Sequence, residues 1–214
     1  MLKVKNNSVL IKLQTVRQGP NENVMENELE KFMTKNTTLS GELIASIVES
    51  AVVKEYNKGT VLLKAGDCVN ACYLILKGCI RSYVMRDGEE KTIEFYTEEQ
   101  PVNPPGFGKQ IPSEIYLDCI EDTVAVAGTP EQEMAMFEKY PEVESATLVM
   151  VEKMMADYQS SFAEYKLSSA EERYLKLLAE RPGLVQRVPQ YQLASYLGVQ
   201  PESLSRIRKR IAKK

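Results

Sequence analysis

Residues 189–211 read PQYQLASYLGVQPESLSRIRKRI, two short amphipathic helical segments on either side of a glycine. Counted from Gln190, apolar residues fall at positions four, eight, ten, fifteen and eighteen: Leu193, Leu197, Val199, Leu204 and Ile207. This spacing is typical of two helices that cross steeply over a short turn. Ala194 supplies the small residue that such a crossing needs, and Gly198 tolerates a positive φ in the turn. The stretch therefore predicts a helix-turn-helix.

The second segment has an apolar side and a polar side. Pro201 stands in the first turn, where its missing N–H costs nothing, while Leu204, Ile207 and Ile211 point inward. The residues expected to face outward and contact DNA are Glu202, Ser203, Ser205, Arg206, Lys209 and Arg210. The major groove of DNA accepts one α-helix. In it, Arg can form a bidentate contact with guanine, Glu can accept a hydrogen bond from cytosine, and Ser or Lys can contact the phosphates. We predict a head that reads DNA; the alternative is a hairpin that only closes a core.

Charge is unevenly distributed along the chain. From Arg181 to Lys214 there are eight basic residues and one acid, Glu202, so this tail carries +7; because the whole chain carries −3, residues 1–180 carry −10. Such asymmetry indicates a polyanionic partner at the C-terminal end. A solvated basic helix terminus would also account for the charge.

Upstream of the head, a long helical segment is predicted over residues 141–167, with Pro141 at its start. Its wide, Met-rich apolar stripe is formed by Val143, Thr147, Met150, Met154, Tyr158, Ser161 and Tyr165, and is widened by Val151, Met155 and Phe162. A stripe of this width has to be buried, and a coiled-coil seam with a second copy competes with packing on the chain's own barrel. We predict a dimerisation helix. A shorter helix follows, opening with Ser168 or Ser169 at capping-box spacing from an acid.

Residues 56–129 alternate with period two. The runs VLLKAGD, ACYLILKG, IRSYVMRDG and KTIEFYTEE are punctuated by glycines, and DCIEDTVAVAG adds at least one more strand. Asp87-Gly88 between two of the runs is the strongest hairpin signal. Short strands at this spacing predict an antiparallel sandwich or barrel. Helical patterning precedes them, first just after Met25 and then in LSGELIASIVESAVV from Leu39.

Composition narrows the functional class. The chain has no histidine, which excludes Ser-His-Asp and Cys-His catalysis and histidine-ligated zinc. Four cysteines at irregular spacing, without a C-x-x-C pair, indicate reduced thiols in strands. No run of 18 apolar residues or signal peptide is present, so we expect a cytoplasmic protein that does not enter a membrane. We expect no catalytic residues, no metal and no cofactor.

The stretch GTVLLKAGDCVNACYLILKGCIRSYVMRDGEEKTIEFYTEEQ is similar to the cyclic-nucleotide-binding β-roll of the CRP/FNR family of bacterial transcription regulators, and LASYLGVQPESLSRIRKRI resembles the family's recognition head. The resemblance spans residues 29–212 and implies an α+β fold. An antiparallel, jelly-roll-like β-roll with flanking helices is expected over 25–140, a dimerisation helix over 141–167 and a helix-turn-helix domain over 168–214. Residues 1–24 are predicted to be a poorly ordered leader, with Met25 as the natural start.

The resemblance also implies partners and roles. It implies a homodimer whose two recognition helices enter successive major grooves of double-stranded DNA about 34 Å apart. Carried over by position, Glu202 and Arg206 match the family's base-reading Glu and Arg, and Pro201 replaces a residue that contacts DNA. RNA polymerase is a further candidate partner.

The sensor part departs from the family. Its cyclic-nucleotide binders hold the phosphate with a Gly-Glu pair and, about ten residues on, an Arg followed by Ser or Thr; here Asn103-Pro104 and Ser113-Glu114-Ile115 stand there. No arginine occurs between Arg86 and Arg173, and a buried phosphodiester needs such a partner. The remaining candidates for an effector pocket are Gly106, Gly108, Lys109 and Ser113. The iron-sulfur branch does not fit either, because the first cysteine is Cys68.

We therefore predict a dimeric, sequence-specific transcription regulator with a lost or remodelled phosphate pocket, which is not a cyclic AMP receptor and whose effector, if any, is unknown. One alternative is a small-molecule sensor whose main output is not promoter binding. Another is a metal-dependent barrel enzyme, although such sites usually need histidine ligands.

Overall fold

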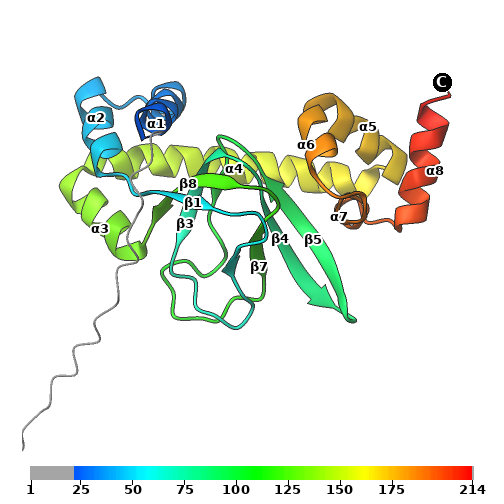
Figure 1. Cartoon of the computed structure of the whole chain (residues 1–214). Helices are drawn as coiled ribbons and strands as arrows, with labels where there is room; N and C mark the ends of the chain where they lie inside the picture. Colours follow the sequence, from blue (N-terminus) through cyan, green and yellow to red (C-terminus); the bar gives the residue numbers. More distant parts are fainter. Residues whose placement is uncertain (1–21, 214) are drawn as a thin grey trace, which may run out of the picture.

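The computed structural model describes residues 22–213, and Figure 1 shows three parts along one long helix. Helices α1 (Glu22–Asn36), α2 (Gly41–Ser50) and α3 (Pro130–Lys139) lie at one end, strands occupy the middle, and a helical head lies at the other end. Helix α1 begins at Glu22, so the predicted leader boundary at residue 24 falls inside a helix; residues 1–21 of that leader lie outside the described residues.

The middle part is a β-roll of eight strands, residues 53–128. They are β1 (Val53–Tyr56), β2 (Val61–Leu63), β3 (Cys72–Lys77), β4 (Ile80–Arg86), β5 (Glu89–Tyr96), β6 (Pro101–Val102), β7 (Tyr116–Cys119) and β8 (Thr123–Gly128). Two antiparallel sheets, in the orders β1-β8-β3-β6 and β2-β7-β4-β5, face each other across an apolar core. The predicted Asp87-Gly88 hairpin joins β4 to β5, with Asp87 at φ 54° and Gly88 at φ 79°.

One sequence boundary needs correction. The stretch from Leu39 is predicted to be helical through Val53, but α2 ends at Ser50 and Val53 starts β1, where it pairs with Val126. Its β-branched side chain suits that sheet position better than a helix end. The stretch DCIEDTVAVAG, predicted to add at least one more strand, holds the end of β7 and the whole of β8, so that prediction is confirmed.

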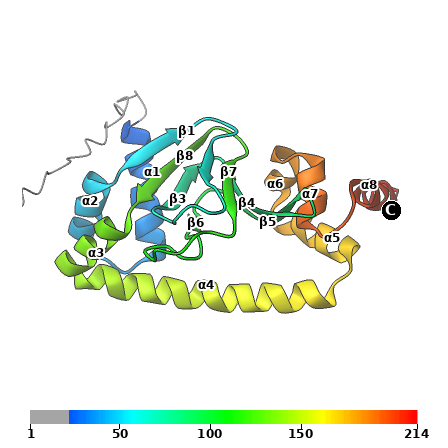
Figure 2. The same cartoon turned by 90° about the horizontal axis from the view of Figure 1, so that it is seen from below.

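Helix α4 (Pro141–Leu167) runs the length of the molecule, as Figure 2 shows. None of its residues is fully buried, and the predicted apolar stripe consists of a half-buried part and an exposed part. Val143, Thr147, Met150 and Met154 are half-buried against the rest of the chain, whereas Val151, Met155 and Phe162 are exposed. The chain's own packing therefore covers only part of the apolar surface.

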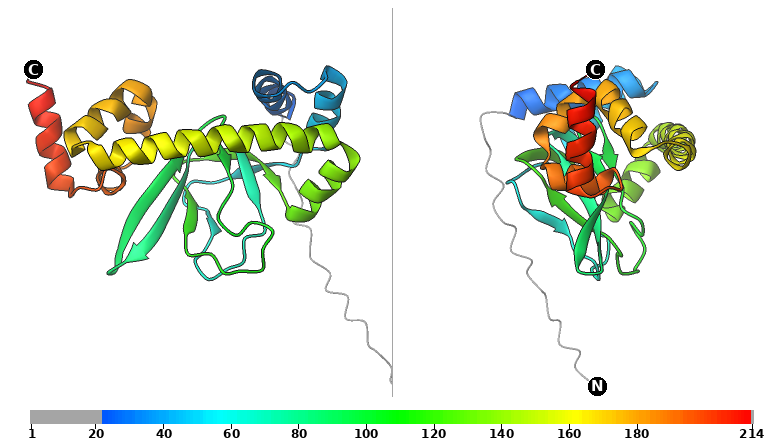
Figure 3. Two further views of the ribbon diagram at one scale, coloured as in Figure 1. Left: turned by 180° about the vertical axis from the view of Figure 1, so that it is seen from behind. Right: turned by 90° about the vertical axis from the view of Figure 1, so that its right-hand side faces the viewer.

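The head, residues 168–213, contains α5 (Ala170–Glu180), α6 (Pro182–Arg187), α7 (Gln190–Tyr196) and α8 (Pro201–Ile211). The N-terminus of α5 has the predicted capping box, formed by Ser169 and Glu172. In Figures 1 and 3, α8 is the outermost helix, and α5, α6 and α7 lie between it and the β-roll. Within residues 22–213, no helix is both long enough and apolar enough to span a membrane.

Candidate nucleic-acid interface

The outer side of α8 carries the polar residues that the sequence assigns to DNA contact. Leu204 and Ile207 are buried in the head, which fixes the opposite side of the helix toward solvent. Exposed Glu202, Arg206 and Lys209 are three or four residues apart, so they lie on one face. None of the six predicted contact residues is buried: Glu202, Ser203, Ser205, Arg206, Lys209 and Arg210.

Three of these six, Ser203, Arg206 and Arg210, are engaged within the head. Arg206 Nη2 donates a hydrogen bond to Ser203 Oγ at 3.2 Å, which places the guanidinium beside the first turn of α8. Arg210 forms an ion pair with Glu171 of α5. Among the ion pairs of residues 22–213, neither Arg206 nor Lys209 takes part. The charge of Arg206 and Lys209 is therefore available to a partner.

The turn between α7 and α8 matches its prediction. Ala194 is fully buried at the helix contact, and Gly198 has φ 69°. A Cβ at Gly198 would lie 2.6 Å from Tyr165 Oη of α4. A side chain at this position would thus need an unfavourable backbone conformation and would also collide with α4.

Arg173 of α5 fastens this turn to the end of α4. Its Nε and Nη2 donate to the Leu197 carbonyl at 3.3 and 2.9 Å, and its Nη1 donates to the Ser168 carbonyl at 2.6 Å. The guanidinium carbon lies 4.4 Å from the centroid of the Tyr165 ring. Leu197 directly precedes Gly198, so the turn that positions α8 is held by α4 and α5.

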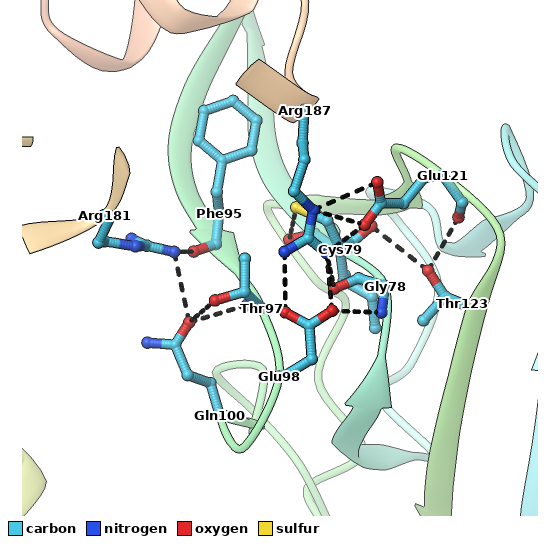
Figure 4. Close-up of polar contacts among 11 residues, drawn as sticks. Gly78, Cys79, Phe95, Thr97, Glu98, Gln100, Glu121, Thr123, Arg181 and Arg187 are labelled. Atoms are coloured by element: carbon cyan, nitrogen blue, oxygen red, sulfur yellow. Dashed lines mark hydrogen bonds and ion pairs between the residues drawn. The ribbon is translucent and has the colours of Figure 1, made fainter. Parts of the chain in front are cut away.

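The head also docks on the β-roll, most visibly through Arg187 of α6 (Figure 4). Its Nη1 and Nη2 donate to the two carboxylate oxygens of Glu98 at 2.8 Å, and its Nε donates to Glu121 at 3.0 Å. Nη2 also reaches the Gly78 carbonyl at 2.9 Å, while the Gly78 N–H donates to Glu98. The hydrogen bonds that Arg187 donates to Glu98 and Glu121 raise the pKa of its guanidinium, which therefore stays charged.

Gly78 has to be a glycine for this contact to form. Its φ is 104°, and a Cβ there would lie 2.6 Å from Thr123 Oγ1 and 2.7 Å from backbone atoms of the β7–β8 turn. Because backbone cannot move aside as a flexible side chain does, only glycine brings the β3–β4 turn this close to Asp122 and Thr123. The carbonyl of Gly78 is thereby presented to Arg187.

A second arginine, Arg181, lies between α5 and α6. Its Nη1 donates to Glu94 Oε1 at 3.0 Å. Its Nη2 donates to the Phe95 carbonyl and, at 3.3 Å, to Gln100 (Figure 4). Tyr196 Oη of α7 donates to the other Glu94 oxygen at 3.4 Å. Glu94 thus accepts from two parts of the head.

The apolar contact between head and β-roll is continuous with the core of the head. Cys79, Phe95 and Ile120 of the β-roll belong to one buried cluster with head residues that include Leu177 and Leu193. Burial, and then the charge of Glu121, raise the pKa of the Cys79 thiol to about 12, so this thiol is protonated and unreactive in the docked state. A backbone contact completes the junction: the Thr92 N–H of β5 donates to Ser195 Oγ of α7 at 2.9 Å.

Sequence reasoning missed the docking residues. The predicted basic tail includes Arg181, Arg187 and Arg210, but all three are ion-paired with glutamates of this chain, so the net charge that the tail presents to a partner is smaller than the sequence indicates. The one sequence feature that could have indicated this contact is the opposite charge of the Glu98-Glu99 pair and the arginines of the tail. The spacing of these glutamates and arginines along the sequence does not indicate that they contact each other in the fold.

The four candidate effector residues lie in the loop between β6 and β7, where the Lys109 N–H donates to the Gly106 carbonyl at 2.8 Å. Gly106 and Gly108 have φ of 92° and 70°, and Lys109 is exposed. Ser113 is buried, and its Oγ donates to the Ile115 carbonyl at 2.9 Å and accepts from the Ile115 N–H at 3.1 Å. Their role in binding an effector stays a prediction.

A cleft of about 530 Å³ opens beside this loop. It is lined by β2, β3 and the turn between them, including Asp67, Cys68 and Tyr73. The loop reaches its rim through the Ser113 N–H, which donates to the Asp67 carbonyl at 2.8 Å. The cleft therefore belongs to the turn before β3 and not to the predicted effector residues.

Comparison with known proteins identifies the domain type. Residues 53–140 match the family model of the cyclic nucleotide-binding domain. A search of curated proteins finds no match to the chain.

Solved structures share the overall fold. The c-di-GMP responsive global regulator CLP of Xanthomonas campestris has a TM-score of 0.62 at 16% identity, over 81% of this chain and 92% of that one. FixK2 from Bradyrhizobium japonicum has a TM-score of 0.60 at 19% identity, over 76% and 85%. The catabolite activator protein of Thermus thermophilus has a TM-score of 0.50 at 20% identity, over 82% and 85%. The predicted fold class, an antiparallel β-roll with flanking helices and C-terminal helices, is confirmed.

Proposed function

We propose that this chain is a sequence-specific DNA-binding transcription regulator that acts as a homodimer and places α8 in the major groove. The observation that carries the proposal is the exposed face of α8 with Glu202, Arg206 and Lys209, opposite the buried Leu204 and Ile207. One α-helix fits the major groove, Arg and Glu are base-reading residues, and Lys contacts phosphate. Residues 168–214 then form a helix-turn-helix domain, and residues 25–140 a cyclic-nucleotide-binding-like domain.

The homodimer is supported by the exposed side of α4. Its apolar residues alternate at spacings of three and four, as a and d positions do in a coiled coil: Leu148, Val151, Met155, Tyr158, Phe162 and Tyr165. All six are between 46% and 62% exposed in the single chain. A parallel α4 pair across a two-fold axis would cover this stripe and present two α8 helices to half-sites of a pseudo-palindrome about 34 Å apart.

The β-roll performs no reaction in this proposal. The Asn103-Pro104 and Ser113-Glu114 positions argue against a cyclic AMP receptor, because a cyclic phosphate there would lack a guanidinium partner. RNA polymerase is the natural protein partner of such a regulator, and the cytoplasm is its compartment.

The match of residues 53–140 to the cyclic nucleotide-binding domain favours one second candidate, a small-molecule sensor whose main output is not promoter binding. The two candidates differ in DNA specificity. A regulator should prefer its operator over random DNA by about a thousandfold or more at physiological salt. A sensor with a basic tail would bind all duplexes weakly and alike, with a steep salt dependence.

The decisive experiment is selection of bound duplexes from a random pool, with and without cyclic AMP. The proposal expects an enriched inverted repeat under both conditions. Salt titration of the enriched and a scrambled duplex then separates specific from nonspecific affinity. Recovery of unenriched sequence, together with equal affinity for both duplexes, would reject the regulator.

Two substitutions on α8 test the assigned roles. Arg206→Ala should cost about 1 to 3 kcal/mol on the selected operator and relax one base position, whereas Lys209→Ala should weaken all duplexes alike. Both side chains are exposed, so neither variant should lose its fold, which circular dichroism checks. Equal losses of Arg206→Ala on operator and random DNA would show that Arg206 does not read a base.

A further inference from the structure

We infer that the β-roll itself holds the head in one orientation with α8 uncovered, so that the chain binds its operator without a small-molecule effector. The inference rests on the proposed function and concerns the regulation of the same DNA-binding face. It follows from how the head is fastened, from what the fastening leaves exposed, and from the loop where an effector would be expected.

The head is fastened at two separate places. On one side, Arg187 and Arg181 bind carboxylates and carbonyls from four segments of the β-roll, around a shared apolar cluster. On the other side, Arg173 ties the α7–α8 turn to the end of α4, and Lys176 of α5 pairs with Glu164 of α4. Since rotation about one contact would break the other, the two together fix the direction of α8.

Docking leaves the DNA-binding face open. The hydrogen bonds to the β-roll come from Arg181, Arg187, Ser195 and Tyr196, which precede α8. Within residues 22–213, no described hydrogen bond or ion pair joins α8 to the β-roll. Figures 1 and 2 agree with this, because α8 is the outermost helix of the head. The contact holds the head without covering the helix that would read DNA.

The loop before β7 has no evident place for an anionic effector. Phe107 and Ile115 pack against the core of the β-roll, and the Ser113 hydroxyl is already bonded on both sides within its own turn. Lys109, the one cation of residues 103–115, is exposed. A ligand shifts a conformational equilibrium only by its difference in affinity for the two states. Phe107, Ser113 and Ile115 are already engaged within the β-roll, so this loop can give an anionic ligand little difference in affinity between the docked and undocked head.

The fraction of molecules whose head is docked sets the apparent affinity for the operator. If the docked head is the binding-competent state and is nearly fully populated, an effector can raise the apparent operator affinity by less than about twofold. If docking is loosened so that the competent fraction falls to about a tenth, the affinity falls about tenfold. Contacts with nonspecific DNA depend on charge more than on head orientation and should change less.

The experiment uses the full chain and two readouts. The first is the affinity for the selected operator, without ligand and with excess cyclic AMP or cyclic GMP. The second is the alkylation rate of each cysteine, followed by peptide mass spectrometry. Cys79 is 0% exposed under the head, Cys119 is 1% exposed in the β-roll core, and Cys68 is exposed. Cys79 therefore reports undocking, and Cys119 reports unfolding of the β-roll.

The test variant is Arg187→Gln, with Arg86→Gln on the exposed hairpin as the matched control. Arg187→Gln should speed alkylation of Cys79, leave Cys119 protected and weaken operator binding about tenfold. Arg86→Gln should change neither readout. If Cys119 also becomes reactive in Arg187→Gln, Glu98→Gln is the second variant, because it removes one charge but keeps an isosteric hydrogen-bonding group.

Three results would overturn the inference. The first is operator binding that requires an added cyclic nucleotide. The second is tighter operator binding by Arg187→Gln than by wild type, which would make docking inhibitory. The third is alkylation of Cys79 in the wild type as fast as that of Cys68. A protected Cys79 with no sequence preference under any condition is a different result. It would reject the proposed DNA-binding function while leaving the docked head in place.

Discussion

At the scale of single residues, the N-terminus of α8 lacks a side-chain cap. Gln200 is the N-cap, with φ −74° and ψ 150°, and its side chain accepts no hydrogen bond from the first turn. Its carbonyl accepts from the Ser203 and Leu204 N–H groups, so the backbone is in capping position and only the side-chain acceptor is lacking. Ser, Thr, Asn or Asp at this position would accept from an N–H that now depends on water.

We predict that Gln200→Thr stabilises the chain by about 0.5 to 1 kcal/mol, because the threonine hydroxyl would accept from the Glu202 N–H, a donor of the first turn that the Gln200 carbonyl does not bind. Thermal unfolding measures the gain. Gln200→Ala is the control, and it should be close to neutral because the glutamine side chain makes no cap bond. A neutral or destabilising Gln200→Thr would mean that residue 200 is not the functional cap in solution.

Single residues also show where sequence reasoning works. Ala194 and Gly198 were predictable, because a tight helix crossing and a positive φ are local demands that few residues meet. Arg187 was not predictable, since its partners Glu121, Glu98 and Gly78 lie 66, 89 and 109 residues away. An arginine in a basic tail has the same local signature whether it binds phosphate or a distant carboxylate.

At the scale of elements, α4 carries two apolar faces that the sequence merges into one. Val143, Thr147, Met150 and Met154 are half-buried, and the six-residue heptad stripe from Leu148 to Tyr165 faces solvent. The two sets are separated by roughly a quarter turn at about 100° per residue. Periodicity alone could not divide so wide a stripe, because only the position of the β-roll decides which edge it covers.

The exposed stripe predicts the effect of a charge at its centre. Met155→Glu would set two carboxylates opposite each other at an a position of a parallel pair, so the dimer should dissociate. Val149→Glu is the matched control, since Val149 is an exposed apolar residue of α4 that lies off the stripe. Sedimentation should give the 24.2 kDa chain for Met155→Glu and twice that mass for Val149→Glu and wild type. Equal masses for the two variants would remove α4 from the interface.

At the scale of the whole molecule, the ion pairs that dock the head make its stability depend on pH. Burial alone would raise the pKa of Glu98, but hydrogen bonds from Arg187 and from backbone N–H groups outweigh burial and lower the pKa below its usual 4.5. The docked state therefore binds fewer protons at Glu98 than the unfolded chain. Its stabilising contribution is complete above the unfolded pKa and is lost as pH falls through the lower, folded pKa.

We predict that wild type melts at a higher temperature than Glu98→Gln at pH 7, and that this difference narrows as pH falls below about 4.5. The difference should be modest at any pH, because the side chain of Glu98 is 40% exposed and its ion pair is screened by solvent. Glu114→Gln, at an exposed position of the β6–β7 loop, is the control for loss of one carboxylate away from the docking contact. A melting-temperature difference for Glu98→Gln that is constant from pH 7 to about 3 would mean that Glu98 gains nothing from Arg187. The head would then be held by the apolar cluster around Cys79 and Phe95 and by the remaining arginine contacts.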